Sequence, residues 1–253
     1  MLGNQLLTVT VTTASLVAFQ LISSGPSLNY SFANMGFISP ALANTPQYVP
    51  PSRGTPQRTE AGGSRGCIKS IPLSITLLVP NNHIGQTVSE RPTFSWYVSN
   101  PTAVSVPLQF ALVEPGVARP LLVTSLKADK TGLMQLELPK DAPELQPKHQ
   151  YRWTVSLICN AKRPSENVYV TGWVERVTAT TNQAKAIMEA GSNNERAVVY
   201  AQSGMWYDAL TNMYKAFQAN PQDPSTSESF VSLLDEAGLT QVARQEQQRL
   251  NGK

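Results

Sequence analysis

The sequence has 253 residues, of which 41% are hydrophobic and 15% are charged, a balance typical of a folded soluble protein rather than a disordered one. Its net charge of +3 comes entirely from residues 44–70, because sixteen Lys and Arg match sixteen Asp and Glu from residue 71 onwards. A neutral folded part lacks the clustered cations that displace counterions from a nucleic acid, so no nucleic-acid partner is expected.

Residues 1–43 contain no Asp, Glu, Lys or Arg, and residues 6–22 within them are mostly apolar. The segment ends in Pro40-Ala41-Leu42-Ala43, a small-x-small pattern that signal peptidase accepts. We therefore predict an export signal over residues 1–43, cleaved before Asn44. An N-terminal membrane anchor is the alternative, although a run of about 17 residues with several Thr is marginal for spanning a bilayer. We expect no stable membrane span after cleavage, and delivery to the periplasm, the medium or the thylakoid lumen.

Residues 44–70 are rich in Pro and Gly with scattered Arg, a composition that buries little and predicts a basic linker. Its cations could contact an anionic surface. Because charged segments of this kind are usually solvated, we favour a solvated tether.

Residues 71–178 show short apolar and aromatic runs separated by turn-forming Pro, Asn, Gly and Asp. Seven such runs at regular spacing, with no helix between them, predict a seven-stranded antiparallel β-sandwich of the immunoglobulin or fibronectin type III kind. The predicted strands are residues 73–79, 93–98, 106–113, 121–127, 132–138, 150–159 and 167–177.

The last two predicted strands, joined by a polar turn at residues 160–165, are expected to form a central core hairpin. Tyr151 and Trp153 share one face of the first of these strands, because side chains alternate along a strand. Just upstream, Leu145-x-Pro147-x-x-x-Tyr151 has the spacing of a tyrosine corner, in which the Tyr hydroxyl bonds to backbone a few residues earlier. We therefore interpret the aromatic residues of this hairpin as core filling.

After residue 178 the hydrophobic spacing changes to a helical period, which predicts a helical subdomain over residues 179–253. The predicted helices are residues 183–190, 195–203, 206–219, 227–237 and 240–250. The expected fold class is therefore α+β, with a β-sandwich followed by a small helical subdomain.

The second and third predicted helices resemble a single tetratricopeptide repeat, because small residues stand where the helices would touch and a Pro stands at the exit. The matching residues are Tyr200, Gly204, Tyr207, Ala209, Ala216 and Pro221. Since arrays normally need three or more repeats, we favour a structural cap over a peptide-binding groove. Met205, Trp206 and Tyr207 could form an exposed anchor for a partner, although packing at the turn of a helical hairpin explains them without a function.

The sequence offers few groups for catalysis, metal binding or cofactor binding. Its two His residues, His83 and His149, have no ligand spacing, and no nucleophile elbow, phosphate loop or dinucleotide motif occurs. We therefore predict no catalytic, metal or cofactor site. Glu90, Glu166 and Glu175 are the best acidic candidates because they flank strand ends, but solvated carboxylates are the commoner explanation.

Several short motifs follow one another along the chain. They are Arg65-Gly66-Cys67, Glu90-Arg91-Pro92-Thr93-Phe94, Tyr151-Arg152-Trp153, Leu157-Ile158-Cys159, Gly172-Trp173-Val174-Glu175-Arg176-Val177 and Gly204-x-Trp206-Tyr207-Asp208-Ala209-Leu210. In combination they resemble the exported cyanobacterial family known as domain of unknown function 928, over residues 50–245. The resemblance implies a photosynthetic bacterial source and an exported location. It implies no activity, because none is assigned to the family.

Two functional hypotheses follow. The first is a non-catalytic envelope protein whose sandwich and helical cap bind another envelope protein or peptide through an exposed apolar or aromatic patch. The second is a carbohydrate-binding or carbohydrate-active module, which as an enzyme would place two acidic groups about 5 to 9 Å apart across a cleft. A ligand sensor is a weaker third. We favour the first, because a repeat-like helical pair is present and recognisable reactive groups are not.

The two cysteines, Cys67 and Cys159, lie far apart and lack the C-x-x-C spacing or His neighbours of a metal or redox site. In an oxidising compartment a disulfide is their natural state. We hypothesise that this bridge pins the segment entering the sandwich onto the central hairpin. Two buried, unlinked thiols are the alternative.

The predicted disulfide closes a loop of about 90 residues and should stabilise the fold by about 4 kcal/mol in the chain-entropy model. Alkylation of the unreduced, denatured protein, read by mass spectrometry, should therefore label no thiol, and reduction should expose both. Labelling of both thiols before reduction would contradict the bridge.

Overall fold

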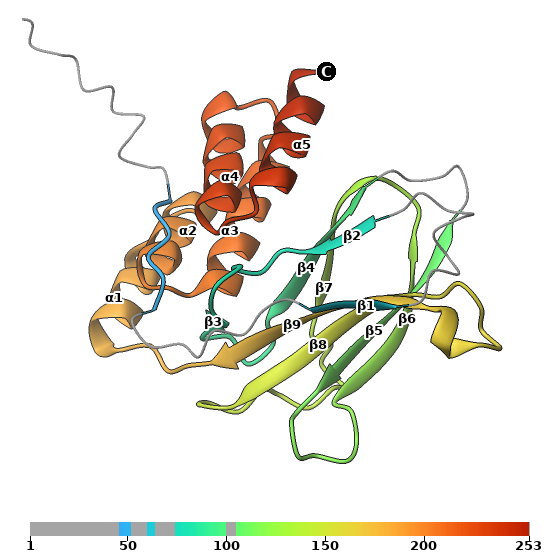
Figure 1. Ribbon diagram of the computed structural model, residues 1–253. Helices are drawn as coiled ribbons and strands as arrows, with labels where there is room; N and C mark the ends of the chain where they lie inside the picture. The colour runs from blue at the N-terminus through green and yellow to red at the C-terminus, as the bar shows by residue number, and fades with distance from the viewer. Residues whose placement is uncertain (1–45, 52–59, 64–73, 100–104, 253) are drawn as a thin grey trace, which may run out of the picture. The chain divides into compact units, whose positions relative to one another are not determined.

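The computed structural model describes residues 46–51, 60–63, 74–99 and 105–252, and the predicted export signal at residues 1–43 lies outside these ranges (Figure 1). In the described part, the strands come first and the helices follow, so the fold class is α+β as predicted. No helix within those ranges is long and apolar enough to cross a membrane.

All seven predicted strands are present, with ends that differ from the prediction by at most two residues. They are β2 (Ser74–Leu77), β4 (Thr93–Ser99), β5 (Val106–Val113), β6 (Leu122–Ala128), β7 (Gly132–Glu137), β8 (Gln150–Leu157) and β9 (Val168–Arg176). Two short strands, β1 (Glu60–Gly63) and β3 (Gly85–Thr87), are not predicted. Their sequences, Glu-Ala-Gly-Gly and Gly-Gln-Thr, lack the alternating apolar residues by which strands are recognised.

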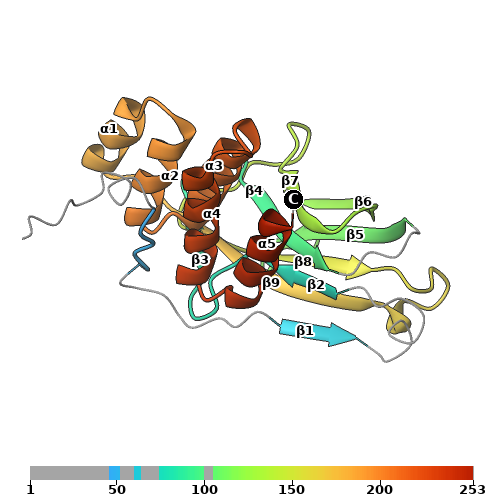
Figure 2. The ribbon, with the colours of Figure 1, turned by 90° about the horizontal axis from the view of Figure 1, so that it is seen from above.

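The described strands form two sheets. One has the order β1, β9, β8, β5, β6, which Figure 2 shows from one edge to the other, and the second has the order β2, β4, β7. On the outer edge of β9, β1 pairs antiparallel along residues 168–171 and β3 pairs parallel along residues 174–176. The larger sheet is therefore mixed, and the prediction of a purely antiparallel, seven-stranded sandwich is wrong on both points.

The two sheets bury an aromatic core between them. Phe94 on β4 contacts Phe110 on β5 and Trp153 on β8, with ring centroids 5.1 Å and 5.2 Å apart, and all three side chains are fully buried. The Tyr151 hydroxyl accepts the Gln146 backbone N–H at 2.7 Å, as the tyrosine-corner spacing predicts. This core matches the interpretation of Tyr151 and Trp153 as core filling. For the other two rings of the hairpin the interpretation is wrong, because Trp173 is half-buried and Tyr169 is 44% exposed on the other face of the sheet.

All five predicted helices are also present. They are α1 (Thr181–Glu189), α2 (Asn193–Gln202), α3 (Trp206–Ala219), α4 (Pro224–Glu236) and α5 (Thr240–Asn251). α4 begins after Asp223, whose carboxylate accepts the Ser225 N–H at 3.1 Å, and Pro224 takes the first helical position, where its missing N–H costs nothing.

Helix α3 bonds to both sheets. The Trp206 indole N–H donates to the Leu78 carbonyl, just beyond β2, at 2.8 Å. The Trp153 indole N–H on β8 donates to the Tyr207 hydroxyl at 2.8 Å, and that hydroxyl donates to the Trp173 carbonyl on β9, also at 2.8 Å. Each of these buried polar groups has a partner, which is the condition for burying it at low cost.

Part of the predicted linker packs against the helices. Tyr48 is 6% exposed, its hydroxyl lies 2.6 Å from Nε2 of His83, and its ring meets Trp206 edge-on. The Val49 N–H donates to the Ala201 carbonyl at 3.0 Å. Together with strand β1, this corrects the prediction of a solvated tether over the whole of 44–70, because one aromatic ring among prolines supplies apolar surface that composition hides.

Helix α5 lies against β4 through a buried charge. Glu246 is 1% exposed and accepts two hydrogen bonds from Arg249 Nε at 3.1 Å and a third from its Nη2 at 2.5 Å. Burial and the nearby Glu246 carboxylate raise the pKa of Tyr97, on β4, to about 12. A charge paired in this way can be buried, and its hydrogen bond with the Tyr97 side chain links α5 to the sheet.

Asp208, in the first turn of α3, fastens the helix to the edge of the larger sheet. Asp208 is 8% exposed, and its carboxylate accepts the Val88 N–H, one residue beyond β3, at 3.0 Å. Burial raises the pKa of this carboxyl from 3.8 to about 6, against hydrogen bonds from Val88 and Thr87 that lower it. Ionisation of the Asp208 carboxyl is therefore less favourable in the folded chain than in the unfolded chain.

This raised pKa predicts a pH dependence of stability. The folded chain binds the Asp208 proton more tightly than the unfolded chain, so the stabilisation is complete below pH 3.8 and is lost as the pH rises through about 6. Asp208→Asn keeps an acceptor for Val88 but does not titrate. Relative to this variant, the free energy of unfolding of the wild type should fall by about 2 kcal/mol from pH 4 to pH 7 in urea titrations. A difference that does not change with pH would contradict the assignment.

Candidate functional site

The residues predicted as a possible partner anchor are buried. Met205, Trp206 and Tyr207 are 2%, 0% and 2% exposed. Trp206 and Tyr207 bond to the two sheets, as described above, and Met205 follows the turn between α2 and α3. Their side chains are therefore not available to a partner and serve the packing that was the other interpretation.

The His and Glu candidates do not come together in one site. His83 contacts Tyr48, and His149 Nδ1 lies 2.6 Å from Glu114. The three carboxylates have different neighbours: Glu90 pairs with Arg176 at 2.9 Å, Glu166 with Arg163 at 3.2 Å, and Glu175 accepts from Gln86 at 3.5 Å. Across the part of the chain that the structure describes, no group of three or more His, Cys, Asp or Glu could hold a metal ion.

Cys159 lies just beyond β8 and packs, partly buried, against the hydrophobic core. Its backbone N–H donates to the Asn167 side chain at 3.0 Å across the hairpin turn. Cys67 lies outside the described residues. The disulfide between the two cysteines therefore stays a prediction.

The helices contain a repeat of 34 residues that sequence reasoning missed. Gly204 ends α2 and Gly238, 34 positions later, ends α4, both with a positive φ, +76° and +80°, that favours glycine. Met205 N–H donates to the Tyr200 carbonyl at 2.9 Å, and Leu239 N–H donates to the Leu234 carbonyl at the same distance. These are the bonds of a Schellman cap, so α2–α3 and α4–α5 are equivalent hairpins.

Only one repeat is recognised from the sequence because the second hairpin has Leu234 and Leu250 where the first has Tyr200 and Ala216. The spacing of the two glycines is the signal that could have found it. The offset of 34 positions between the two hairpins equals the period of the tetratricopeptide unit.

The two hairpins differ on one face. Five positions that are apolar and buried in the first hairpin are polar and exposed in the second. Ala201, Trp206, Leu210, Met213 and Phe217 correspond to Asp235, Thr240, Arg244, Gln247 and Asn251. A polar outer face is typical of the last repeat in an array, since no further repeat covers it.

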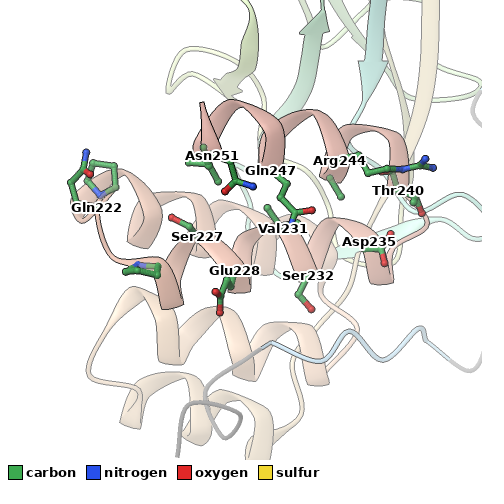
Figure 3. A pocket seen from close by; sticks show the side chains of 14 residues that line it. Gln222, Ser227, Glu228, Val231, Ser232, Asp235, Thr240, Arg244, Gln247 and Asn251 are labelled. Carbon is green, nitrogen blue, oxygen red and sulfur yellow. The ribbon is translucent and has the colours of Figure 1, made fainter. Parts of the chain in front are cut away.

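These polar residues line a groove between α4 and α5 (Figure 3). Its volume is about 620 Å³, within the range of about 300–1,000 Å³ that is usual for ligand sites. Val231 and Leu250 are half-buried and Ala243 is buried, so apolar side chains lie among the polar ones. The groove can bury an apolar stripe of a partner while polar groups surround it.

Charge is distributed unevenly between the two helices of this groove. Glu228 and Asp235 are exposed on α4, while Arg244 is exposed on α5 and donates to the Thr240 carbonyl at 3.4 Å. Within the described residues neither of these carboxylates has an ion-pair partner. Both are therefore free to pair with cations of a bound molecule.

Comparisons with known proteins give a family and no function. No curated protein matches the chain. Among solved structures, a beta-glucosidase from Listeria innocua in complex with glucose is 13% identical with a TM-score of 0.26, and the match covers 48% of this chain and 17% of that one. A multi-domain immunophilin from Arabidopsis thaliana is 8% identical with a TM-score of 0.17, over 79% of this chain and 100% of that one. Likenesses this low carry no argument about fold or activity.

The family model described as Domain of Unknown Function (DUF928) matches residues 60–247. This match runs from strand β1 into helix α5, and so includes both sheets and both helical hairpins. Because it spans well over half of the chain, the protein belongs to the DUF928 family.

Proposed function

We propose that this protein is an exported, non-catalytic cell-envelope protein whose α4–α5 groove binds a helix of another envelope protein. The observation that carries the proposal is the 34-residue repeat, which ends in an open groove where a further helix of the array would pack. Export rests on the signal-like sequence of residues 1–43, and the bacterial source on the family resemblance.

The first hairpin supports a helix as the occupant of the groove. There, α4 packs against α3 through Phe230, whose ring stacks on Phe217 at 5.4 Å and contacts Tyr214 at 5.7 Å. Asn251, which lines the groove, stands 34 positions after Phe217. By the repeat relation, a helix at the groove would lie on α5 as α4 lies on α3.

The side chains that line the groove indicate which kind of partner helix would fit. Val231, Ala243 and Leu250 call for an apolar stripe at helical spacing. Cationic side chains beside that stripe would pair with Glu228 and Asp235. The fitting partner is therefore an amphipathic helix with Lys or Arg on one flank. The polar rim suits a transient complex rather than a permanent one.

The remaining structural assignments belong to the same proposal. We place the strands in the immunoglobulin and fibronectin type III class, extended by β1 and β3 at one edge. This is supported by the tyrosine corner at Tyr151 and by the separation of β2, β4 and β7 from β5, β6, β8 and β9. We place the helical hairpins in the tetratricopeptide class on the basis of their period.

Two matched substitutions test the groove. Val231→Arg puts a large charge on its apolar side, while Val123→Arg makes the same change at a 52% exposed position on β6. In affinity capture from envelope extracts of the source cells, Val231→Arg should lower the recovery of the partner about tenfold or more, since a loss of 1.4 kcal/mol is tenfold in affinity. Val123→Arg should recover it as the wild type does.

A partner recovered equally by both variants, with unchanged thermal unfolding, would rule out the groove. A photo-crosslinking amino acid at Gln247, which lines the groove, should join the captured protein to α5. Crosslinks that form only from a β6 position would place the interface on the sheet instead.

A further inference from the structure

A second cavity lies on the outer face of the larger sheet. It has a volume of about 260 Å³ and is lined by residues 113–117 of the turn after β5, together with Arg152 and Trp173. In Figure 1, the helices and the smaller sheet lie on the opposite side of the larger sheet. The cavity is therefore separate from the α4–α5 groove, and it lies on the face of the sheet opposite the helices.

Strand register places its main side chains in one row. Arg152 on β8 is directly opposite Val113 on β5 and Trp173 on β9. Trp153, the next residue along β8, is fully buried in the core, so Arg152 and Trp173 point to the outer face. Arg152 is exposed and Trp173 is half-buried, which leaves part of the indole ring accessible.

The polar groups of this row have hydrogen-bond donors and acceptors that can bind a ligand. Within the described ranges, the Arg152 guanidinium and the Trp173 indole N–H make no hydrogen bond or ion pair. Glu114 lies 2.6 Å from His149 Nδ1 through one carboxylate oxygen, and its other oxygen can accept further bonds. An aromatic face, a planar donor and an acceptor thus converge on one small cavity.

We propose that this cavity binds one hexopyranose unit of a glycan. A sugar ring has an apolar face of C–H groups, which the Trp173 ring would cover, and a rim of hydroxyls, which Arg152 and Glu114 would bond. The volume of about 260 Å³ is just under the lower end of the range of about 300–1,000 Å³ that is usual for ligand sites, so it suits a ligand as small as a single ring.

A second ring on the same strand gives the site a direction. Tyr169 is 44% exposed and stands four residues before Trp173, which puts both on one face of β9 at a spacing of about 13 Å. Thr171 between them is short, and its hydroxyl lies 3.1 Å from that of Thr154. The short Thr171 side chain therefore leaves room between the two rings, and an oligosaccharide would lie along β9 from Trp173 towards Tyr169.

The inference is tested with defined oligosaccharides on the full chain. Isothermal titration calorimetry with cellobiose, cellohexaose and chitohexaose should detect binding of at least one hexamer. For that ligand, Trp173→Ala and Arg152→Ala should weaken binding about tenfold or more, whereas Trp173→Phe, which keeps an aromatic face, should retain most of it. Val123→Ala, on neighbouring β6, is the control that should bind as the wild type does.

Tyr169→Ala separates the two rings of the site. It should weaken a hexamer while leaving cellobiose affinity unchanged, because a disaccharide at Trp173 does not reach Tyr169. Absence of binding by all three sugars at millimolar concentration, or equal binding by Trp173→Ala, would overturn the site. Neither result depends on the helix-binding groove, which these substitutions do not touch.

Discussion

The hydroxyl of Tyr207 is the contact on which the arrangement of sheets and helices depends. It accepts from the Trp153 indole and donates to the Trp173 carbonyl, so one atom of α3 joins two strands of the larger sheet. Trp206, one residue earlier, bonds to the backbone beside the smaller sheet. Burial raises the pKa of Tyr207 above its usual range, and the group therefore stays neutral at physiological pH.

This junction leaves accessible the two surfaces on which the proposals rest. With α3 buried against the sheets, the α4–α5 hairpin presents its polar outer face to solvent, and the groove lies on this face. The larger sheet buries one face under the helices and the smaller sheet, so the row from Val113 to Trp173 remains open on the other. The proposed helix partner and the proposed glycan therefore bind separate elements and need not compete.

The sequence predicts most of the fold because apolar residues recur with the period of the element that buries them. The alternation of Tyr151 and Trp153 identifies a strand, and the helical spacing after residue 178 identifies the helices. It does not reveal β1, β3 or the packed Tyr48, whose stability comes from tertiary contacts rather than from local pattern. The candidate sites are harder to predict from the sequence than the fold. In the sequence, Trp206 fits either a partner anchor or turn packing, and its hydrogen bond to the Leu78 carbonyl shows that it belongs to the core. The groove is recognised only when the two hairpins are compared in the structure.

Native-state hydrogen exchange on the Tyr207→Phe variant tests the central claim that α3 makes the sheets and helices one cooperative unit. The substitution leaves the buried Trp153 indole N–H without its acceptor, a loss of about 1–3 kcal/mol. If the junction couples the parts, the most protected amides of α4 and of β8 should lose protection by the same amount. A loss confined to the α4 amides, with β8 unchanged, would contradict it.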